Sequence, residues 1–430
     1  MKKMLSMMLA GTMILSLAAC GSSSTDTGSA AADQETGEEV TNEAVEAEGF
    51  VPALDTDTEA TLYFVGSYGN FEALDQVALD FQTYYPGVEV VYTKLDDYRN
   101  DLANRFATGQ EIDLFMVEWW DEAYDLNQNI IDNAEDLSSA GLDLSSLQAD
   151  LLAQGQVDGA QVVMPLYLQS WGYLVNLDIL EACGVEIPTT YDELIDACGQ
   201  LAEAGYEQPV YINSSIYGRT FTGYYMSRRM AGSDEVAALD ETLERADALY
   251  DSGYVNAEGD TLEDGYEAMI LRFFEGDVPF QSISLGNYSG TKKREAKSEA
   301  FTENPFDYAY IPAPYGDESG TYMNQLGSIY VGAYKDSQQL DLANEFLRFM
   351  LTDEEMGTFA EIKNLATANT NVGLEDFPYL AAADKFYVTE DGIDSLDEER
   401  ALNVFSKYDI GGDHSEMYEK MNDYLENGIN

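Results

Sequence analysis

Histidine and basic residues are scarce in this chain of 430 residues, and their scarcity excludes several classes of protein. His414 is the only histidine, so neither an HExxH motif nor a zinc site built from several histidines is possible, and a Ser-His-Asp triad could only use His414. Lysine and arginine number 21 against 80 aspartates and glutamates, which gives a net charge of −59. Because such a chain repels nucleic-acid phosphates, we predict no nucleic-acid partner.

Cysteine is also scarce, with three in the whole chain. Cys183 and Cys198 fall in or beside segments with helical spacing, where we interpret them as small buried residues, although a disulfide between them stays open. The chain contains no CxxC, GxSxG or Walker motif. Carboxylates are so abundant that a pair at glycosidase spacing is expected by chance. We therefore predict no catalytic residue, no metal and no cofactor.

The segment Met1–Cys20 has the composition of an export signal, because basic residues precede an apolar run that ends in Leu-Ala-Ala-Cys. This ending resembles the bacterial lipobox. We therefore predict that Cys20 is lipidated and anchors a monomeric protein at the extracellular face of a membrane, with a Gram-positive surface favoured. The alternative is an ordinary secretory signal with an incidental cysteine. Residues 21–59 are small and polar and then acidic, which predicts a disordered tether.

The segment Gln161–Leu180 places two apolar runs next to each other, separated only by the polar-aromatic residues Gln169–Trp171. Two buried strands joined without a turn do not fit easily inside one sheet. We therefore predict that the chain leaves one α/β lobe here and enters another. Ligand sites form preferentially in crevices of this kind.

Upstream of this crossing, apolar strands alternate with helical patterns. The predicted strands are Thr61–Val65, Val88–Tyr92 and Ile112–Val117, and Asn70 is the predicted N-cap of the first helix. This alternation indicates an α/β lobe with a mostly parallel sheet. Parallel sheets of this type bind ligands beyond the carboxyl ends of their strands.

All three tryptophans stand at strand ends or at the crossing. Trp119 and Trp120 follow the third predicted strand, and Trp171 lies between the two apolar runs of the crossing. We interpret them as a stacking platform for a ligand rather than as core residues.

Three blocks of the chain resemble, in order, the family 1 extracellular solute-binding proteins of ABC importers, the group that includes maltose-binding proteins. The blocks are ATGQEIDLFMV, DGAQVVMPLYLQSWGYLVNLDILEACGVEIPTTYDELIDACGQL and LGSIYVGAYKDSQQLDLANEFLRFML, and the resemblance covers Thr61–Leu351. It implies a two-lobed periplasmic-binding-protein-like fold of type II, with a multi-strand hinge. The implied N-terminal lobe is 60–168 plus 313–357, and the implied C-terminal lobe is 169–312 plus 358–430.

The resemblance also implies further crossings, at Pro312–Pro314 and near Thr352–Asn364.

Within the second lobe, Thr190 and Glu193 have the spacing of a capping box, which predicts the start of a helix. The basic run Lys292–Arg294 is interpreted as exposed surface.

In function, the resemblance implies a lipid-anchored receptor that captures a carbohydrate, an oligosaccharide above all, and delivers it to an ABC permease. Gln169 stands where maltose-binding members carry an acid, which argues against maltose itself. The rival interpretations are a receptor for a polyamine or another cationic solute, and a secreted carbohydrate-active enzyme. The predicted ligand contacts are polar and aromatic residues at strand ends, which suit the hydroxyl rim and apolar faces of a sugar: Ser67, Tyr68, Asn70, Glu118, Trp119, Trp120, Tyr167, Gln169, Trp171, Asn213, Tyr217, Asn287 and, from the family pattern, Tyr288.

Overall fold

The computed structural model describes residues 49–385, apart from residues 68, 70, 119–127, 222–223, 225–227, 229–232, 234, 263–264, 317–321, 324–325 and 383. The predicted signal segment with Cys20 and most of the predicted tether lie outside the described residues. The compact unit begins at Phe50 and contains two five-stranded sheets with helices packed on them, which confirms the α/β class. In the described part of the chain, no helix combines the length and apolar character needed to span a bilayer.

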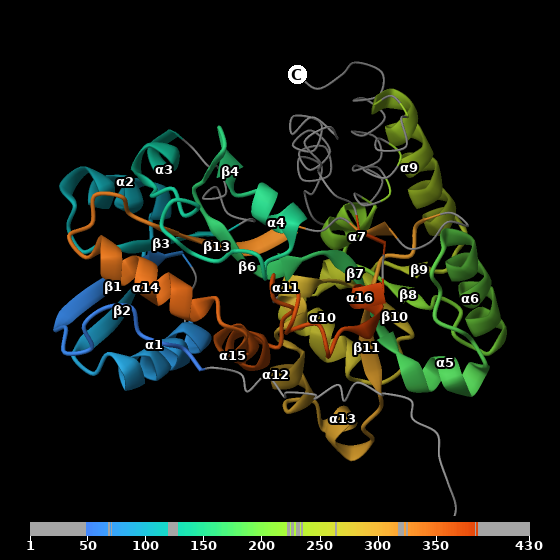
Figure 1. The fold of residues 1–430 in the computed structure, drawn as a ribbon. Coiled ribbons are helices and arrows are strands. Elements are labelled where there is room, and N and C mark those ends of the chain that lie inside the picture. The colour runs from blue at the N-terminus through green and yellow to red at the C-terminus, as the bar shows by residue number, and fades with distance from the viewer. Residues whose placement is uncertain are drawn as a thin grey trace, which may run out of the picture. The chain divides into compact units, whose positions relative to one another are not determined.

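The first sheet has the strand order β2-β1-β3-β13-β6, and Figure 1 shows β13, from late in the chain, between β3 and β6. The strand β1 pairs in parallel with β2 and β3, whereas β13 runs antiparallel to β3 and β6. The predicted parallel arrangement thus applies to β2-β1-β3, and strands at the crossings make the sheet mixed. The elements of this part are β1 (Ala60–Gly66), α1 (Glu72–Tyr84), β2 (Val88–Lys94), α2 (Tyr98–Thr108), β3 (Leu114–Glu118), α3 (Gln128–Asn133), α4 (Ala149–Ala153), β4 (Gln156–Val157), β5 (Ala160–Gln161), β6 (Met164–Gln169), β13 (Leu326–Ala333), α14 (Leu340–Met350) and α15 (Asp353–Lys363).

The two faces of the first sheet are covered by different helices, because successive residues of a strand point to opposite sides. On β1, Phe64 belongs to the apolar cluster that contains Phe81 of α1 and Phe346 of α14. The next residue, Val65, belongs to the cluster that contains Phe106 of α2. Burial on both faces explains why these strands are continuous apolar runs in the sequence.

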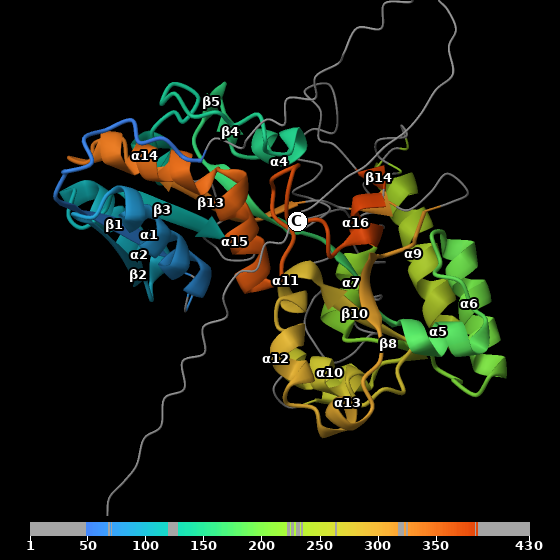
Figure 2. The same cartoon turned by 60° about the horizontal axis from the view of Figure 1, so that its bottom comes forward.

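The second sheet has the order β11-β7-β10-β8-β9, with β10, β8 and β9 parallel and β7 antiparallel to both β10 and β11. Figures 1 and 2 both show α5, α6 and α9 together on one side of it and α10, α12 and α13 on the other. The elements of this part are β7 (Trp171–Asn176), α5 (Leu177–Cys183), α6 (Tyr191–Glu203), β8 (Val210–Tyr211), α7 (Ser214–Thr220), α9 (Glu235–Asp251), β9 (Val255–Asn256), the 3-10 helix η2 (Glu258–Thr261), α10 (Gly265–Phe273), β10 (Phe280–Ser284), α11 (Leu285–Tyr288), α12 (Thr291–Glu295), α13 (Glu299–Glu303), β11 (Tyr308–Pro312) and α16 (Pro378–Ala382), and a further short pair joins β12 (Tyr322–Met323) to β14 (Asp384–Lys385).

Local signals in the second part behave as the sequence indicates. The capping box is confirmed, because the Thr190 hydroxyl accepts from the Glu193 amide and the Glu193 carboxylate accepts from the Thr190 amide. Cys183 and Cys198 are both free, and burial raises the pKa of the Cys198 thiol to about 12. Cys198 is therefore a small buried residue of α6 and not half of a disulfide.

The crossings join the two sheets. The predicted break at Gln169–Trp171 is confirmed, because β6 ends at Gln169 in the first sheet and β7 begins at Trp171 in the second. The chain after α15 still follows the first sheet, where the Leu168 amide donates to Ala366 and the Ala368 amide donates to Leu166. The third passage therefore lies later than the predicted 352–364. The boundary residues of the two lobes otherwise stay a prediction.

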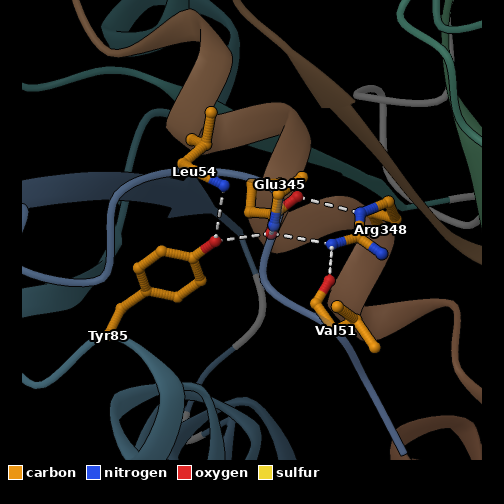
Figure 3. Close-up of polar contacts among 6 residues, drawn as sticks. Val51, Leu54, Tyr85, Glu345 and Arg348 are labelled. Carbon is orange, nitrogen blue, oxygen red and sulfur yellow. Dashed lines mark hydrogen bonds and ion pairs between the residues drawn. The ribbon is translucent and has the colours of Figure 1, made fainter. Parts of the chain in front are cut away.

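One buried carboxylate holds the start of the compact unit against α14 and against Tyr85, the residue after α1 (Figure 3). Glu345 of α14 accepts hydrogen bonds from the Ala53 amide at 2.8 Å, from the Tyr85 hydroxyl at 2.6 Å and from Arg348. We call this set of contacts the N-terminal clamp. The segment Phe50–Leu54 is thus packed on the body, so the folded part begins earlier than the predicted end of the tether at residue 59.

Candidate functional site

The carboxyl ends of three strands lie along one edge of the first sheet. Ser67 follows β1, Glu118 ends β3 and Gln169 ends β6. Because β1 and β3 are parallel, and β13 pairs in register with both Glu118 and Gln169, all three residues lie at the same edge. The Ser67 hydroxyl oxygen there is buried and has no hydrogen-bond partner within the described residues.

The corresponding edge of the second sheet carries the other predicted residues. Trp171 at the start of β7 pairs with Ser284 at the end of β10, and Asn213 follows the end of β8. Directly beyond β10, the short helix α11 contains Asn287 and Tyr288.

Ser170 is the single residue between these two edges. Its hydroxyl lies 2.6 Å from the Tyr310 hydroxyl of β11, and its carbonyl accepts from the Leu285 amide at 2.8 Å. Burial raises the pKa of Tyr310, so this hydroxyl stays neutral and able to donate. The structure therefore brings the strand ends of both sheets to one connected set of residues.

Of the predicted contacts at these edges, one has a polar atom already in use and another is largely buried. Asn213 donates from its amide to the Asp260 carboxylate at 3.0 Å. Tyr288 is 7% exposed and packs against the rings of Tyr310 and Phe377, and its burial raises the pKa of its phenol to about 12.

The structure does not bring Tyr167 and Tyr217 to the site surface. Both are fully buried, and their hydroxyls donate to the backbone carbonyls of Phe359 and Ala246. Tyr167 lies on β6, whose residues are all buried, and Tyr217 of α7 belongs to the apolar cluster of the second sheet. In this conformation neither ring offers surface to a ligand, so we do not keep them among the proposed contacts.

Other predicted positions cannot be compared with the structure. Tyr68, Asn70, Trp119 and Trp120 lie outside the described residues, as does the side chain of Glu118.

Sequence reasoning missed two features near or beyond these edges. The first is Asn364, which caps the C-terminus of α15 in the left-handed region (φ 50°) and donates to the Thr291 hydroxyl at 3.1 Å. An asparagine directly after a helix is the sequence signal that could have predicted this cap. The second is a hollow of about 480 Å³ in which Arg245 lies over the rings of Tyr191 and Tyr224, although α9 looks like a solvated acidic helix in the sequence.

Comparison with solved structures identifies similar folds at low sequence identity. The GacH receptor of Streptomyces glaucescens, solved alone and with acarbose, is 18% identical with a TM-score of 0.58, over 86% of this chain and 98% of that one. RafE from Streptococcus pneumoniae is 16% identical with a TM-score of 0.64, over 85% and 97%. A sugar transporter from Bacillus licheniformis solved with stachyose is 17% identical with a TM-score of 0.55, over 85% and 99%. These likenesses show the two-lobed periplasmic-binding-protein-like fold.

No curated protein matches the sequence closely enough to count as a relative. The profile of one family does match, and it covers residues 66–357, which is more than half of the chain. Members of that family bind solutes and are not enzymes, so the rival interpretation as a carbohydrate-active enzyme is excluded. The chain belongs to the bacterial extracellular solute-binding proteins.

Proposed function

We propose that this protein is the receptor of an ABC importer, that it captures an oligosaccharide at the joined strand ends, and that it delivers the sugar to a membrane permease. The observation that supports this most is the meeting of strand ends from both sheets at Ser170, with the Ser67 hydroxyl buried and unpaired among the described residues. A buried hydroxyl without a partner costs about 1–3 kcal/mol, and a ligand hydroxyl would remove that cost.

The residues at these edges support a sugar as the ligand. The proposed contacts combine aromatic faces with amides, hydroxyls and one carboxylate, as sugars require. Structures of similar fold were solved with acarbose, raffinose and stachyose. The proposed contacts are Ser67, Trp171, Asn213, Asn287 and Tyr288, together with the predicted Tyr68, Asn70, Glu118, Trp119 and Trp120.

A thermal-shift screen of the chain against oligosaccharides, monosaccharides, amino acids and polyamines tests the proposal. A ligand at about 100 times its dissociation constant adds about 2.7 kcal/mol to the free energy of unfolding. We expect an oligosaccharide to give the largest shift and Trp120→Ala to abolish it. Leu79→Ala, at a 58% exposed position on α1, is the control and should bind normally. A shift with polyamines alone would refute the sugar assignment.

The anchor is proposed on the lipobox-like ending at Cys20. Full-length protein is expected in the membrane fraction, and Cys20→Ala is expected to release it. Equal membrane association of the two proteins would contradict lipidation at Cys20.

A further inference from the structure

Gln169 is the last residue of β6, and its side chain is already engaged by the second sheet's elements. Gln169 is only 4% exposed. Its carbonyl oxygen Oε1 accepts from the Ser170 amide at 3.1 Å and from the Gly286 amide of α11 at 2.9 Å. A side-chain amide oxygen has two lone pairs, so these two donors saturate it.

The first three amides of α11 have hydrogen-bond acceptors, and two of these acceptors belong to the crossing. The Leu285 amide donates to the Ser170 carbonyl, the Gly286 amide to Gln169, and the Asn287 amide to the hydroxyl of Ser284, the N-cap of the helix. Helix-start amides lack partners within their own helix, so these external acceptors fix where α11 lies.

The approach of Gln169 to α11 depends on the glycine. A Cβ atom added at Gly286 would lie 2.9 Å from Gln169 Nε2, closer than carbon and nitrogen normally approach. An alanine at this position would therefore displace the amide or the helix. Glycine at this position therefore leaves room for the Gln169 amide beside α11.

We propose that Gln169 is a positioning residue, which holds α11 in place through the Gly286 amide, so that Asn287 and Tyr288 keep their positions at the ligand site. This inference rests on the proposed function, and it revises the sequence-based interpretation of Gln169 as a direct ligand contact. Its carbonyl oxygen is not available to a sugar hydroxyl.

Two substitutions of Gln169 separate positioning from direct contact. Gln169→Met keeps the length of the side chain and removes the acceptor, whereas Gln169→Glu keeps an acceptor and removes the Nε2 donor. We expect Gln169→Met to lose protection of the Gly286 amide from hydrogen exchange and to bind the oligosaccharide about tenfold more weakly, the loss of one hydrogen bond. Gln169→Glu should keep that protection and bind within about threefold of the native protein.

The opposite pattern would overturn the inference. If Gln169→Glu abolishes sugar binding while the Gly286 amide stays protected, Gln169 contacts the sugar through Nε2. If Gln169→Met leaves the exchange of Gly286 unchanged, the hydrogen bond does not hold α11.

Gly286→Ala provides a second route should Gln169→Met fold poorly. It is expected to weaken binding as Gln169→Met does, and the double variant should be no weaker than either single one, because both remove the same contact. Fully additive losses would contradict the inference. Hydrogen exchange is measured without ligand, so failure of every sugar to bind would refute the proposed function and leave the Gly286 measurement as a separate test.

Discussion

Tyr85→Phe is the most informative perturbation of the N-terminal clamp (Figure 3). The Tyr85 hydroxyl donates to the Glu345 carboxylate at 2.6 Å and accepts from the Leu54 amide at 3.2 Å. Phenylalanine keeps the ring and its packing on Phe81 and removes both hydrogen bonds. The substitution therefore isolates the polar part of the clamp.

The expected loss follows from burial. Glu345 is 5% exposed, and its carboxylate accepts from Tyr85, from the Ala53 amide and twice from Arg348. A hydrogen bond to a charged group contributes about 1.5–3 kcal/mol. Because the carboxylate still accepts three hydrogen bonds in Tyr85→Phe, we expect a loss of about 2 kcal/mol in the free energy of unfolding. Glu345→Ala leaves all of these donors without their acceptor and should lower the free energy of unfolding by about 3 kcal/mol. The loss is not larger because Arg348 is partly exposed and can be hydrated.

Urea denaturation measures these losses, with the double variant closing a mutant cycle. The two substitutions share one contact, so we expect a coupling energy of about 1–2 kcal/mol. Tyr84→Phe is the matched control, because Tyr84 is the adjacent residue and makes ring contacts without a hydrogen bond in the described part of the chain. We expect it to change stability by less than about 0.5 kcal/mol. Equal stabilities of Tyr85→Phe and Tyr84→Phe would show that the hydrogen bonds of Tyr85 do not stabilise the fold.

Acid should weaken the clamp. Burial pushes the pKa of Glu345 upward, but its hydrogen bonds from Arg348, Ala53 and Tyr85 outweigh burial and lower it overall. A carboxylate whose folded pKa is depressed stabilises the fold above its unfolded pKa, and this contribution is lost as pH falls through the folded pKa. The difference between the native protein and Tyr85→Phe should therefore shrink in acid.

Two further predictions concern single residues of α15 and α6. Burial, with the charges of Asp80 and Glu354, raises the pKa of Glu355 in the folded protein to about 7. The stability that the protonated Glu355 carboxyl contributes is therefore fully present below its unfolded pKa and is lost as the pH rises through 7. Urea denaturation should find Glu355→Gln close to the native protein near about pH 5 and more stable by about 2 kcal/mol near about pH 8; a constant difference would contradict the shifted pKa. By the same assay, Thr190→Ala should lower the free energy of unfolding by about 1 kcal/mol, whereas Thr190→Ser should leave it nearly unchanged. Equal losses in the two variants would show that the capping hydroxyl does not stabilise α6.

The parts of the fold that could be predicted are those fixed by local patterns. The crossing at Ser170 is visible because two buried strands meet without a turn, and the start of α6 is visible because a capping box needs only Thr190 and Glu193. The antiparallel insertion of β13 could not be derived from local patterns, because strand order depends on pairing between residues far apart in the chain.

The candidate site was predictable at the level of strand ends and not of individual contacts. Strand ends collect at one edge for topological reasons, so Ser67 and Asn213 lie where we expect them. Trp171 lies at the expected edge but is only 5% exposed, so the prediction that it is not a core residue is wrong for this conformation. The exposure of a given tyrosine depends on tertiary packing, and Tyr217 is therefore core despite its place just beyond β8. Gln169 lies at the expected edge. Its hydrogen bond from the Gly286 amide could not be predicted, because the two residues are distant in the sequence.

Intrinsic tryptophan fluorescence is the sharpest test of the proposed sugar site, because we propose all three tryptophans of the chain as sugar contacts, Trp119 and Trp120 from the sequence alone. We expect that titration with an oligosaccharide of the raffinose or stachyose type changes the emission of the native chain in a saturable way. Trp120→Ala should reduce both the change and the affinity. Oligosaccharide binding, detected by calorimetry, without any change in tryptophan emission would contradict a sugar site at these strand ends.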